Sequence, residues 1–411
     1  MANIAILGYG TVGSGVFAVV TNNQDVVARK AGQAVNIKKV LDLRDFPGDP
    51  VEPYLTHRFE DILEDEGIDV VVEVMSGINP AYSFSKRALE AGKSVVTSNK
   101  AVVAQHGDEL IDTARAHGVS YLFEASVGGA IPIIRPLMTS LTADHITEVW
   151  GILNGTTNYI LTEMAEKGAA FADVLKEAQK LGYAEADPTA DVEGHDACRK
   201  IAILSSLAYG KTVDFQQIPT EGITKITAED IAYGKEMGCA IKLLGTSKKT
   251  AHGISAMVAP YFLPLSHPLA SVNGVFNAIF VKGDMSGETM YYGSGAGKLT
   301  TASAVTADII DAIRQKSVFL DWDTSAQLQV EAKDEVPAKA FVRVAFSHKD
   351  TAKKTCNDLF AVVKFVELDA FGDEFGLVVD ALTEAQLAEK AALLAQAPGI
   401  DQVRNIIRME E

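Results

Sequence analysis

The chain has 411 residues, of which 47% are hydrophobic and 22% charged, a composition typical of a folded globular protein with roughly two to three domains. Its 37 basic and 54 acidic residues give a net charge of −17, which argues against a nucleic-acid partner or an anionic membrane partner. The three cysteines, Cys198, Cys239 and Cys356, lie too far apart for a disulfide framework or a thiolate metal site. No signal peptide and no apolar run of about 18 residues stands out, so a cytoplasmic protein is expected.

The first part of the chain alternates short apolar runs with amphipathic segments. Strands are predicted at 2–7, 35–42, 70–74, 94–97 and 120–124, and helices at 14–30, 80–91 and 100–117. This alternation predicts an α/β fold with a Rossmann doubly wound parallel sheet over residues 1–150.

The remainder of the chain predicts two further domains. Helices at 154–166, 171–181 and 193–209, β-rich stretches at 240–260 and 272–292, and a helix at 297–315 predict an α+β domain over 151–318. The chain is expected to return to the first domain at about 293–316. A polar linker is predicted at 319–338, followed by a small domain at 339–411 with the element order βαββαβ.

Three glycines follow the first predicted strand with the spacing of a dinucleotide-binding turn. Gly8 permits a tight turn, Gly10 lets the backbone approach a pyrophosphate, and Gly13 lets the helix pack against the strand. The start of the next helix offers free N–H groups to phosphate. A purely structural turn is the alternative, but the flanking strand and helix supply the context that the motif requires.

The end of the second predicted strand bears on the choice of dinucleotide. An acidic residue at this place would bind the ribose 2′-hydroxyl of NAD, whereas an arginine would bind the 2′-phosphate of NADP. The segment contains both Asp42 and Arg44, so it leaves NAD and NADP open, and a solvated loop is the alternative for Arg44.

Residues 181–200 form a cluster rich in charge. Five carboxylates stand in this stretch, followed by Arg199 and Lys200. A polar surface loop is the ordinary interpretation. However, Asp196 and Lys200 are four residues apart on a predicted helix with apolar neighbours, so they share a face close to a buried one. Partly buried charges need a partner or a function.

Two loops at the carboxyl edge of the predicted sheet are further candidates, since α/β proteins bind their ligands at that edge, and a glycine-rich turn before a later helix is a third candidate. Residues 97–100 follow one strand, and residues 124–132 follow the next, where main-chain carbonyls could converge on a cation beside Glu124. A plain loop explains the second equally well. The glycine-rich residues 293–297 precede a helix and could form another close-approach turn.

Several segments together resemble homoserine dehydrogenase in its monofunctional form. The matching segments, in the family's order, are LGYGTVGSGV (7–16), VVTSNKA (95–101), EASVGGAIPII (124–134), GILNGTTNYIL (151–161), KLGYAEADPTADVEGHDACRK (180–200) and GSGAGKLTTASAV (293–305). The resemblance implies NAD(P)-dependent interconversion of L-aspartate 4-semialdehyde and L-homoserine, a step toward threonine, methionine and isoleucine. It also implies a homodimer or a higher homo-oligomer.

The resemblance also implies roles for individual residues. Lys200 is the expected general acid and base, Lys100 assists at the reacting oxygen, and Glu185 and Asp196 hold the substrate, with Asp191 in support. The residues expected to line the cofactor are Gly8, Gly10, Thr11, Val12, Gly13, Arg44, Ser76, Lys100, Gly182 and Gly297. The residues expected at a sodium site are Glu124, Val127, Gly129 and Ile131.

The sequence departs from the family pattern at some positions. Ser76 stands where the family more often has glycine, and Thr300 where proline is common. The tail resembles an ACT domain in its element order, but residues 347–351 lack the proline-glycine turn that opens the ACT ligand site, so threonine feedback is in doubt. Two alternatives remain: a Rossmann oxidoreductase for another amino-acid aldehyde or alcohol, and a catalytically inactive cofactor-sensing module.

Overall fold

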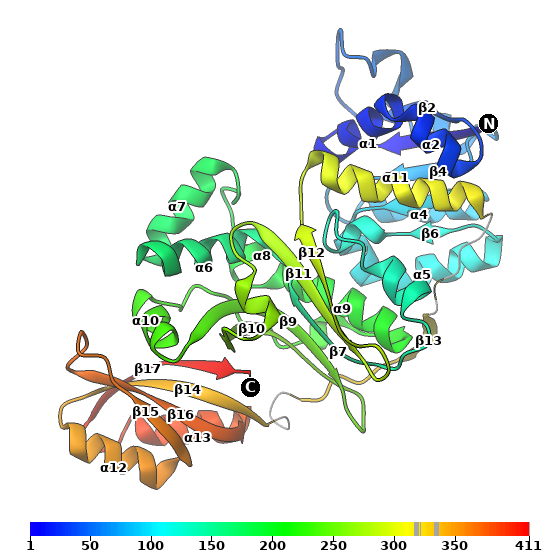
Figure 1. The fold of residues 1–411 in the computed structure, drawn as a ribbon. Coiled ribbons are helices and arrows are strands. Elements are labelled where there is room, and N and C mark those ends of the chain that lie inside the picture. Colours follow the sequence, from blue (N-terminus) through cyan, green and yellow to red (C-terminus); the bar gives the residue numbers. More distant parts are fainter. Residues whose placement is uncertain (316–319, 321, 333–336, 411) are drawn as a thin grey trace. The chain divides into compact units, whose positions relative to one another are not determined.

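The computed structural model describes residues 1–315, 320, 322–332 and 337–410 (Figure 1). The chain forms two compact units: the first contains residues 1–146, 199–215 and 282–328, and the second contains residues 147–198, 216–281 and 329–411. No helix among the described residues is both long enough and apolar enough to cross a membrane.

The first unit is built on a six-stranded sheet in the order β3-β2-β1-β4-β5-β6, in which every neighbouring pair is parallel. This order is that of a Rossmann doubly wound fold, which confirms the predicted fold class. The strands are β1 (Ala2–Leu7), β2 (Val35–Leu41), β3 (Leu55–Thr56), β4 (Val70–Glu73), β5 (Ser94–Thr97) and β6 (Tyr121–Leu122).

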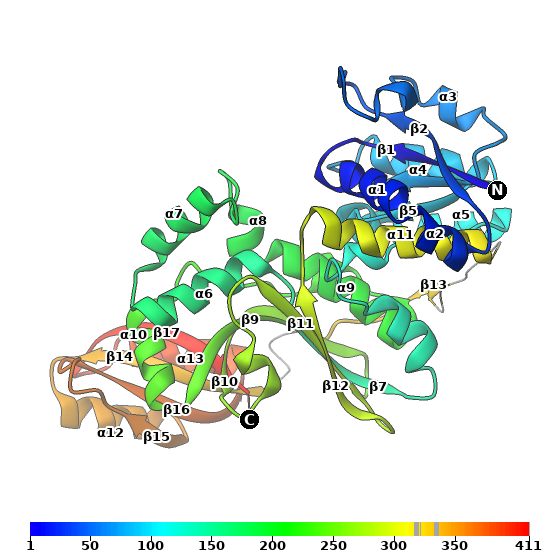
Figure 2. The same ribbon diagram turned by 45° about the horizontal axis from the view of Figure 1, so that its top comes forward.

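Helices cover both faces of this sheet, which is why its central strands are continuous apolar runs. One face carries α1 (Thr11–Asn22), α2 (Gln24–Ala31) and α11 (Lys298–Arg314), and the other carries α4 (Ala81–Glu90) and α5 (Lys100–His117), as Figure 2 shows. A short α3 (Glu60–Leu63) precedes β4. Apolar side chains of α1, α2 and α11 pack in one core with those of β1, β2 and β4.

Two predicted elements of this unit differ from the structure. The single helix predicted at 14–30 is two helices, because Asn23 leaves the helical conformation (φ −108°, ψ 30°) and ends α1 with a hydrogen bond to the carbonyl of Val19. The strand predicted at 120–124 is shorter, because the backbone turns into a single 3₁₀ turn at Glu124–Ser126.

The second unit contributes eight strands to one sheet, in the order β11-β7-β9-β10-β17-β14-β16-β15. Those outside the tail are β7 (Ile146–Ile152), β9 (Cys239–Lys249), β10 (Ile254–Pro264) and β11 (Phe276–Gly283). The helices are α6 (Gly155–Lys167), α7 (Phe171–Leu181), α8 (Thr189–Val192), α9 (His195–Tyr209) and α10 (Ala228–Glu236). The division between the units falls inside α9, and β12 (Gly287–Ser294) leads into α11.

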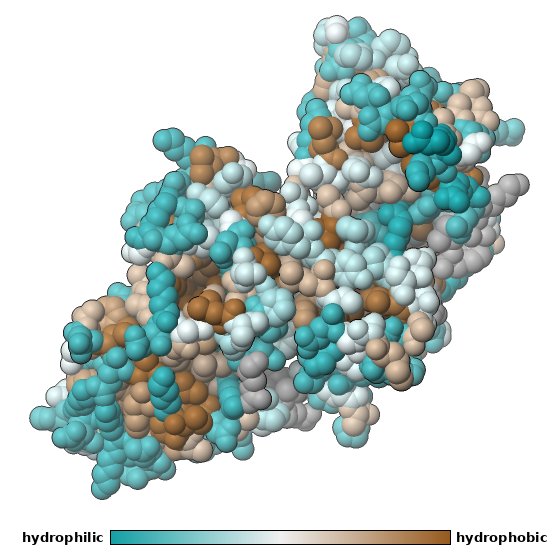
Figure 3. All heavy atoms as spheres, viewed as in Figure 1, coloured by the Kyte–Doolittle hydropathy of each residue, from teal (hydrophilic) through white to brown (hydrophobic). Residues whose placement is uncertain are grey.

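The tail has the predicted βαββαβ order. Its elements are β14 (Pro337–Phe346), α12 (Lys349–Leu359), β15 (Val362–Val366), β16 (Glu374–Thr383), α13 (Glu384–Leu394) and β17 (Ile400–Met409). The tail has its own apolar core, in which the rings of Phe346 and Phe375 stack. In Figure 3 the surface over α12 is hydrophilic, whereas hydrophobic residues gather beside it over β15 and β16.

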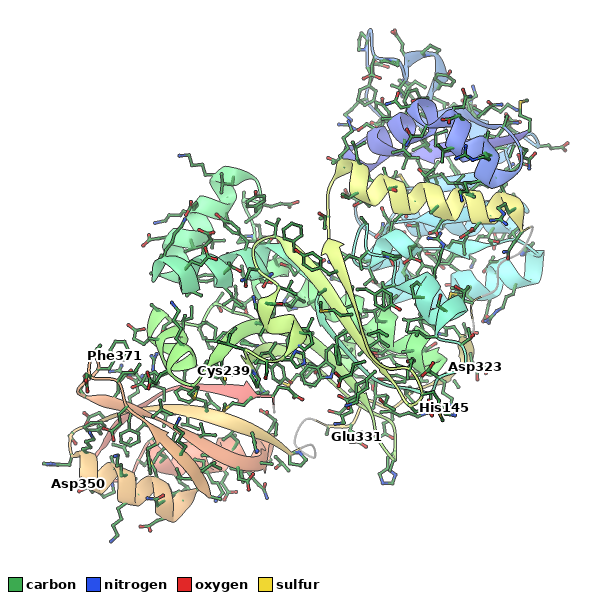
Figure 4. The ribbon with its side chains drawn as sticks, viewed as in Figure 1. His145, Cys239, Asp323, Glu331, Asp350 and Phe371 are labelled. Carbon is green, nitrogen blue, oxygen red and sulfur yellow. The ribbon has the colours of Figure 1, made fainter. Side chains whose placement is uncertain are left out.

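The tail is joined to the rest of the second unit by a shared sheet, and not only by a linker. β17 pairs with β14 on one side and, in parallel, with β10 on the other. The ring of Phe341 contacts those of Phe262 and Tyr233, and Tyr233 also contacts Phe371, which Figure 4 labels. The compact unit that contains the tail also contains residues 147–198 and 216–281.

The segment predicted as a linker contains regular structure in its described part. Residues Asp323–Gln327 form β13, which pairs with β8 (Lys211–Thr212). The indole of Trp322 is buried and donates a hydrogen bond to the hydroxyl of Thr212 (2.9 Å), and Arg115 donates to the carbonyls of Leu320 and Trp322. Burial of the Trp322 side chain thus anchors the described part of the segment 319–338, which was predicted as a linker because its composition is polar.

Candidate active site

The turn between β1 and α1 has the geometry that a pyrophosphate requires. Gly8 has φ +94°, and a Cβ on Gly13 would lie 1.9 Å from the carbonyl oxygen of Gly8, so both positions require glycine. Gly10 is the N-cap of α1, and a Cβ placed on it would have no other heavy atom within 4 Å, so the space beside its backbone is open. Thr11, Val12 and Gly13 form the first turn of the helix, and their N–H groups can donate hydrogen bonds to an anion.

A cavity of about 530 Å³ opens beside this turn. Four of the predicted cofactor residues line it: Gly8, Gly10, Arg44 and Ser76. Its apolar wall includes Phe59 and Phe84, whose rings stack with centroids 4.1 Å apart. The glycine cradle, the helix N-terminus and the apolar wall fit the phosphates and the base of a dinucleotide.

Asp42 and Arg44 form an ion pair at the rim of this cavity. The Asp42 carboxylate accepts hydrogen bonds from Nε and Nη2 of Arg44, both at 2.9 Å, and from the backbone N–H of Tyr9 at 2.8 Å. The hydrogen bonds from Arg44 hold the pKa of Asp42 well below its usual range. His57 lies on the same rim and bonds the Asp42 carbonyl through Nδ1 (2.6 Å).

A buried carboxylate that the sequence reasoning missed lies at the end of β4. Glu73 accepts hydrogen bonds from the Thr97 hydroxyl (2.6 Å) and the Met75 N–H (2.8 Å). Burial raises the pKa of Glu73 to about 7. Because Thr97 also accepts from the N–H of Asn99 (2.9 Å), Glu73 orders the loops that carry Ser76 and Lys100. The signal was the single carboxylate in the apolar run VVVEV.

Lys100 is the first residue of α5, at the carboxyl edge of the sheet. Asn99 caps this helix, since its side chain accepts from the N–H of Val102. The Asn99 amide also donates to the carbonyl of Gly77 (2.7 Å), one residue after Ser76. The structure therefore links the loop of Ser76 to that of Lys100.

The loop after β6 holds the four residues predicted for a cation. The carboxylate of Glu124 accepts hydrogen bonds from the N–H groups of Ile133 (2.7 Å), Ile134 (2.9 Å) and Arg135 (2.8 Å), so this side chain closes its own loop. A cation at this loop would therefore use main-chain oxygens. No group of three or more His, Cys, Asp or Glu side chains in the described part of the chain is arranged to hold a metal ion.

Two of the predicted glycine loops meet each other. A Cβ on Gly129 would lie 2.5 Å from the carbonyl oxygen of Gly295, and the N–H of Ala130 donates to the carbonyl of Ser294. Gly297, the N-cap of α11, has φ +135°. A Cβ on Gly15 of α1 would lie 2.4 Å from the carbonyl of Lys298, so the start of α11 contacts α1 closely.

Asn154 brings two of the predicted substrate carboxylates together in the second unit. Its Nδ2 donates to Oδ1 of Asp191 (2.7 Å) and to Oδ2 of Asp196 (3.0 Å), while its Oδ1 accepts from the N–H of Thr157 and caps α6. Asp196 is buried. Asn154 was not among the predicted site residues, although it lies in GILNGTTNYIL, one of the segments that resemble the family.

The other predicted residues of this region either precede Asp191 or follow Asp196 in the sequence. Glu185 is exposed on the loop between α7 and α8, and Gly182 is the left-handed C-cap of α7. Lys200 is one helical turn beyond Asp196 on α9 and is only 7% exposed. In the first unit, residues of α9 that follow Lys200 line a cavity of about 100 Å³ together with residues of α5.

The fold and this turn define a dinucleotide-binding protein of the doubly wound α/β class. A family model described as the homoserine dehydrogenase NAD binding domain matches residues 8–124, and a homoserine dehydrogenase model matches residues 132–310. Homoserine dehydrogenase of Neisseria gonorrhoeae is 39% identical over 99% of this chain and 98% of that protein. The corresponding protein of Corynebacterium glutamicum is 41% identical over 99% and 95%.

Solved structures of homoserine dehydrogenases are also similar to this chain. The homoserine dehydrogenase of Thiobacillus denitrificans superposes with a TM-score of 0.92 at 37% identity, covering 100% of this chain and 98% of that one. A hyperthermophilic archaeal homoserine dehydrogenase mutant in complex with NADPH superposes with a TM-score of 0.66 at 30% identity, over 76% and 97%. The chain belongs to the homoserine dehydrogenase family, which confirms the resemblance, and its cofactor is NAD or NADP.

Proposed function

We propose that this protein catalyses the reversible, NAD(P)-dependent interconversion of L-homoserine and L-aspartate 4-semialdehyde. The observation that carries the proposal is the pair of carboxylates, Asp191 and Asp196, which Asn154 holds together one helical turn from the buried Lys200. A carboxylate pair suits the amino group of the substrate, and an ammonium suits the oxygen whose charge changes. Membership of the family supports the same assignment.

Each group has a chemical task in this account. Bound nicotinamide supplies the hydride for reduction of the aldehyde and accepts it in the reverse direction. Lys200 protonates the oxygen as it gains negative charge, and it takes the proton back in alcohol oxidation. Lys100 stabilises the same oxygen. Glu185 and Asp196 hold the substrate amino group, and Asp191 supports them.

The first unit holds the cofactor. We assign the pyrophosphate to the N–H groups at the start of α1, with Gly8, Gly10 and Gly13 giving the backbone its close approach. We assign the adenosine ribose to the rim formed by Asp42 and Arg44. Ser76, Lys100, Gly182 and Gly297 are proposed to line the rest of the dinucleotide. The loop at Glu124, with the carbonyls of Val127, Gly129 and Ile131, is proposed for a sodium ion, and the active form is proposed to be a homodimer or a higher homo-oligomer.

Absorbance at the nicotinamide band tests the reaction, with purified protein and L-homoserine in parallel samples of NAD and NADP. Reduction that depends on homoserine supports the proposal. The matched control is 4-hydroxybutanoate, which has the same alcohol and carboxylate but no amino group. Because the proposed site binds that amino group, the control should be oxidised at least about 100-fold less efficiently. Equal rates would favour a different alcohol as substrate, and no reduction with either cofactor would favour a cofactor-sensing module.

A further inference from the structure

The last strand of the chain ends against the substrate-binding part of the second unit. In β17, Arg408 pairs with Tyr261 of β10 on one side and with Ala340 of β14 on the other. The N–H of Glu410 donates to the carbonyl of Phe262 (3.0 Å). Arg408 therefore lies at the position where β17 of the tail joins β10, the neighbouring strand outside the tail.

Arg408 is buried and binds two carboxylates at once. Its Nε and Nη2 donate to Glu384 at 2.6 and 2.7 Å, and its Nη1 and Nη2 donate to Glu221 at 2.9 and 2.8 Å. Glu384 begins α13 of the tail, whereas Glu221 belongs to the segment before α10. Two bidentate pairs on one guanidinium fix both carboxylates in direction as well as in distance.

The segment that begins at Glu221 lies directly against the turn between α8 and α9. The N–H of Ile223 donates to the carbonyl of Val192 (2.8 Å), and the Thr224 hydroxyl donates to the Glu193 carboxylate (3.1 Å). A Cβ on Gly222 would lie 2.1 Å from the Val192 carbonyl, so no other residue allows this approach. A cavity of about 480 Å³ borders the segment, with Glu221, Glu193 and Arg408 in its lining.

That turn sets the spacing between the two carboxylates that Asn154 joins. Asp191 lies in α8 before it, and Asp196 lies in the first turn of α9 after it. Gly194, between them, has φ +83° and donates its N–H to the carbonyl of Asp191 (3.0 Å). A shift of the turn would therefore change the distance between Asp191 and Asp196.

We propose that Arg408 is a positioning residue, which holds the substrate-binding carboxylates in place through Glu221 and the main chain that follows it. The proposal rests on the proposed function, because it assigns Asp191 and Asp196 to the substrate. It gives the tail an indirect part in substrate binding, through its contact with Glu221. The effect is on binding, since neither Arg408 nor Glu221 belongs to the reacting groups.

Steady-state kinetics on three variants test this role. Arg408→Met and Glu221→Gln should each raise the KM for L-homoserine roughly tenfold, a cost typical of small misplacements, and change the KM for NAD(P) less than about twofold. Arg408→Lys should fall between these and the wild type, since an ammonium cannot bind both carboxylates bidentately. The control is Glu384→Gln, which weakens only the interaction of Arg408 with Glu384 inside the tail. It should leave the KM for homoserine unchanged. The proposal is overturned if Glu384→Gln raises that KM as much as Glu221→Gln does.

Amide hydrogen exchange provides a readout that does not depend on the reaction. Exchange at Ile223 and Gly194 should be at least about tenfold faster in Glu221→Gln than in Glu384→Gln, because only the former loosens the segment at the turn. Equal exchange in the two variants would contradict the proposal, even if Arg408→Met fails to fold. If wild-type protein does not oxidise homoserine, the proposed function fails, while this exchange difference still decides whether Arg408 positions the turn.

Discussion

Arg44 binds the carboxylate of Asp42 through two parallel hydrogen bonds, Nε to Oδ1 and Nη2 to Oδ2, each 2.9 Å long. Asp42 also accepts a hydrogen bond from the N–H of Tyr9, which lies in the glycine turn between β1 and α1. The residue type suited to NAD and the residue type suited to NADP are thus partners in one pair. Because the Arg44 side chain is 63% exposed, it can turn toward a 2′-phosphate, and the Asp42 carboxylate, which is 10% exposed, then keeps its hydrogen bond from the Tyr9 N–H.

We therefore predict that Arg44→Ala weakens the use of NADP selectively. The value of kcat/KM should fall roughly 10- to 100-fold with NADP, because a charge-assisted pair with the 2′-phosphate is lost. With NAD it should change less than about threefold, since Asp42 keeps its bond from Tyr9. Initial rates with each cofactor at saturating homoserine give both values. An equal fall of kcat/KM with NAD and with NADP would show that Arg44 supports the structure of the cavity rim and does not bind the 2′-phosphate.

The Asn154 amide gives a second prediction. Asn154→Ser retains a side-chain cap for α6 but loses the bridge between Asp191 and Asp196, so the KM for homoserine should rise about tenfold with a small change in stability. Asn154→Asp retains the cap as well, but it places a third carboxylate beside the other two, and its activity should fall further. Kinetics and thermal melting of the two variants check this order. Activity in Asn154→Asp equal to that of wild type would contradict the proposed role of the bridge.

Glu73 predicts a pH dependence of stability. Its pKa in the folded protein, about 7, lies above its usual value of 4.5, so its contribution to stability is present below about pH 4.5 and is lost as the pH rises through 7. The difference of 2.5 pKa units corresponds to about 3 kcal/mol. Glu73→Gln should therefore be stabilising relative to wild type at pH 8 and much less so at pH 5, as measured by the unfolding midpoint. The exposed Glu90→Gln is the control, and a pH-independent effect of Glu73→Gln would contradict the prediction.

Removal of the tail is predicted to destabilise the second unit. Arg343 of β14 is buried, forms an ion pair with Oδ1 of Asp230 (2.9 Å) and donates a hydrogen bond to the hydroxyl of Thr227 (2.8 Å), and Asn405 of β17 donates to Oδ2 of Asp230 (2.8 Å). A chain that ends at Ala332 leaves Asp230 without these partners and exposes the edge of β10. We expect most of this truncated protein to be insoluble.

A point substitution separates the ion pair from the rest of the tail. Arg343→Met leaves a buried carboxylate without its cation and should cost about 3–5 kcal/mol, and Asp230→Asn in the same chain should restore part of that loss. Thermal melting of the single and double variants measures both effects. A soluble truncated protein with the melting temperature of the full chain would instead show that the tail is an independent module.

The sequence predicted the elements of the first unit closely because their signal is local. Strands such as Val70–Glu73 are apolar runs between turn residues, and the glycines after β1 have the spacing of a dinucleotide-binding turn. The break at Asn23 was missed because residues 14–30 keep a helical apolar pattern across it. β13 was missed because its anchor, Trp322, acts through burial against residues far away in the sequence.

The site was only partly predictable for the same reason. The resemblance placed Asp191 and Asp196 at the substrate, but the amide that joins them comes from Asn154, 37 and 42 residues earlier in the chain. Glu73 acts through Thr97, and Arg408 acts through Glu221, which is 187 residues away. Such partners depend on which strands become neighbours, and no local pattern in one sequence encodes that.

Lys200 is the proposed general acid and base, so its replacement is the decisive test of the proposed reaction. Homoserine-dependent reduction of NAD(P) should be compared in wild type, Lys200→Ala and the exposed control Lys211→Ala, with cofactor binding measured in parallel by nicotinamide fluorescence. We expect Lys200→Ala to lose at least about 100-fold in kcat, the usual contribution of a general acid, while its cofactor binding and the activity of the control variant stay near wild type. Full turnover in Lys200→Ala would contradict the role proposed for Lys200, because the proton would then have to be transferred by another group.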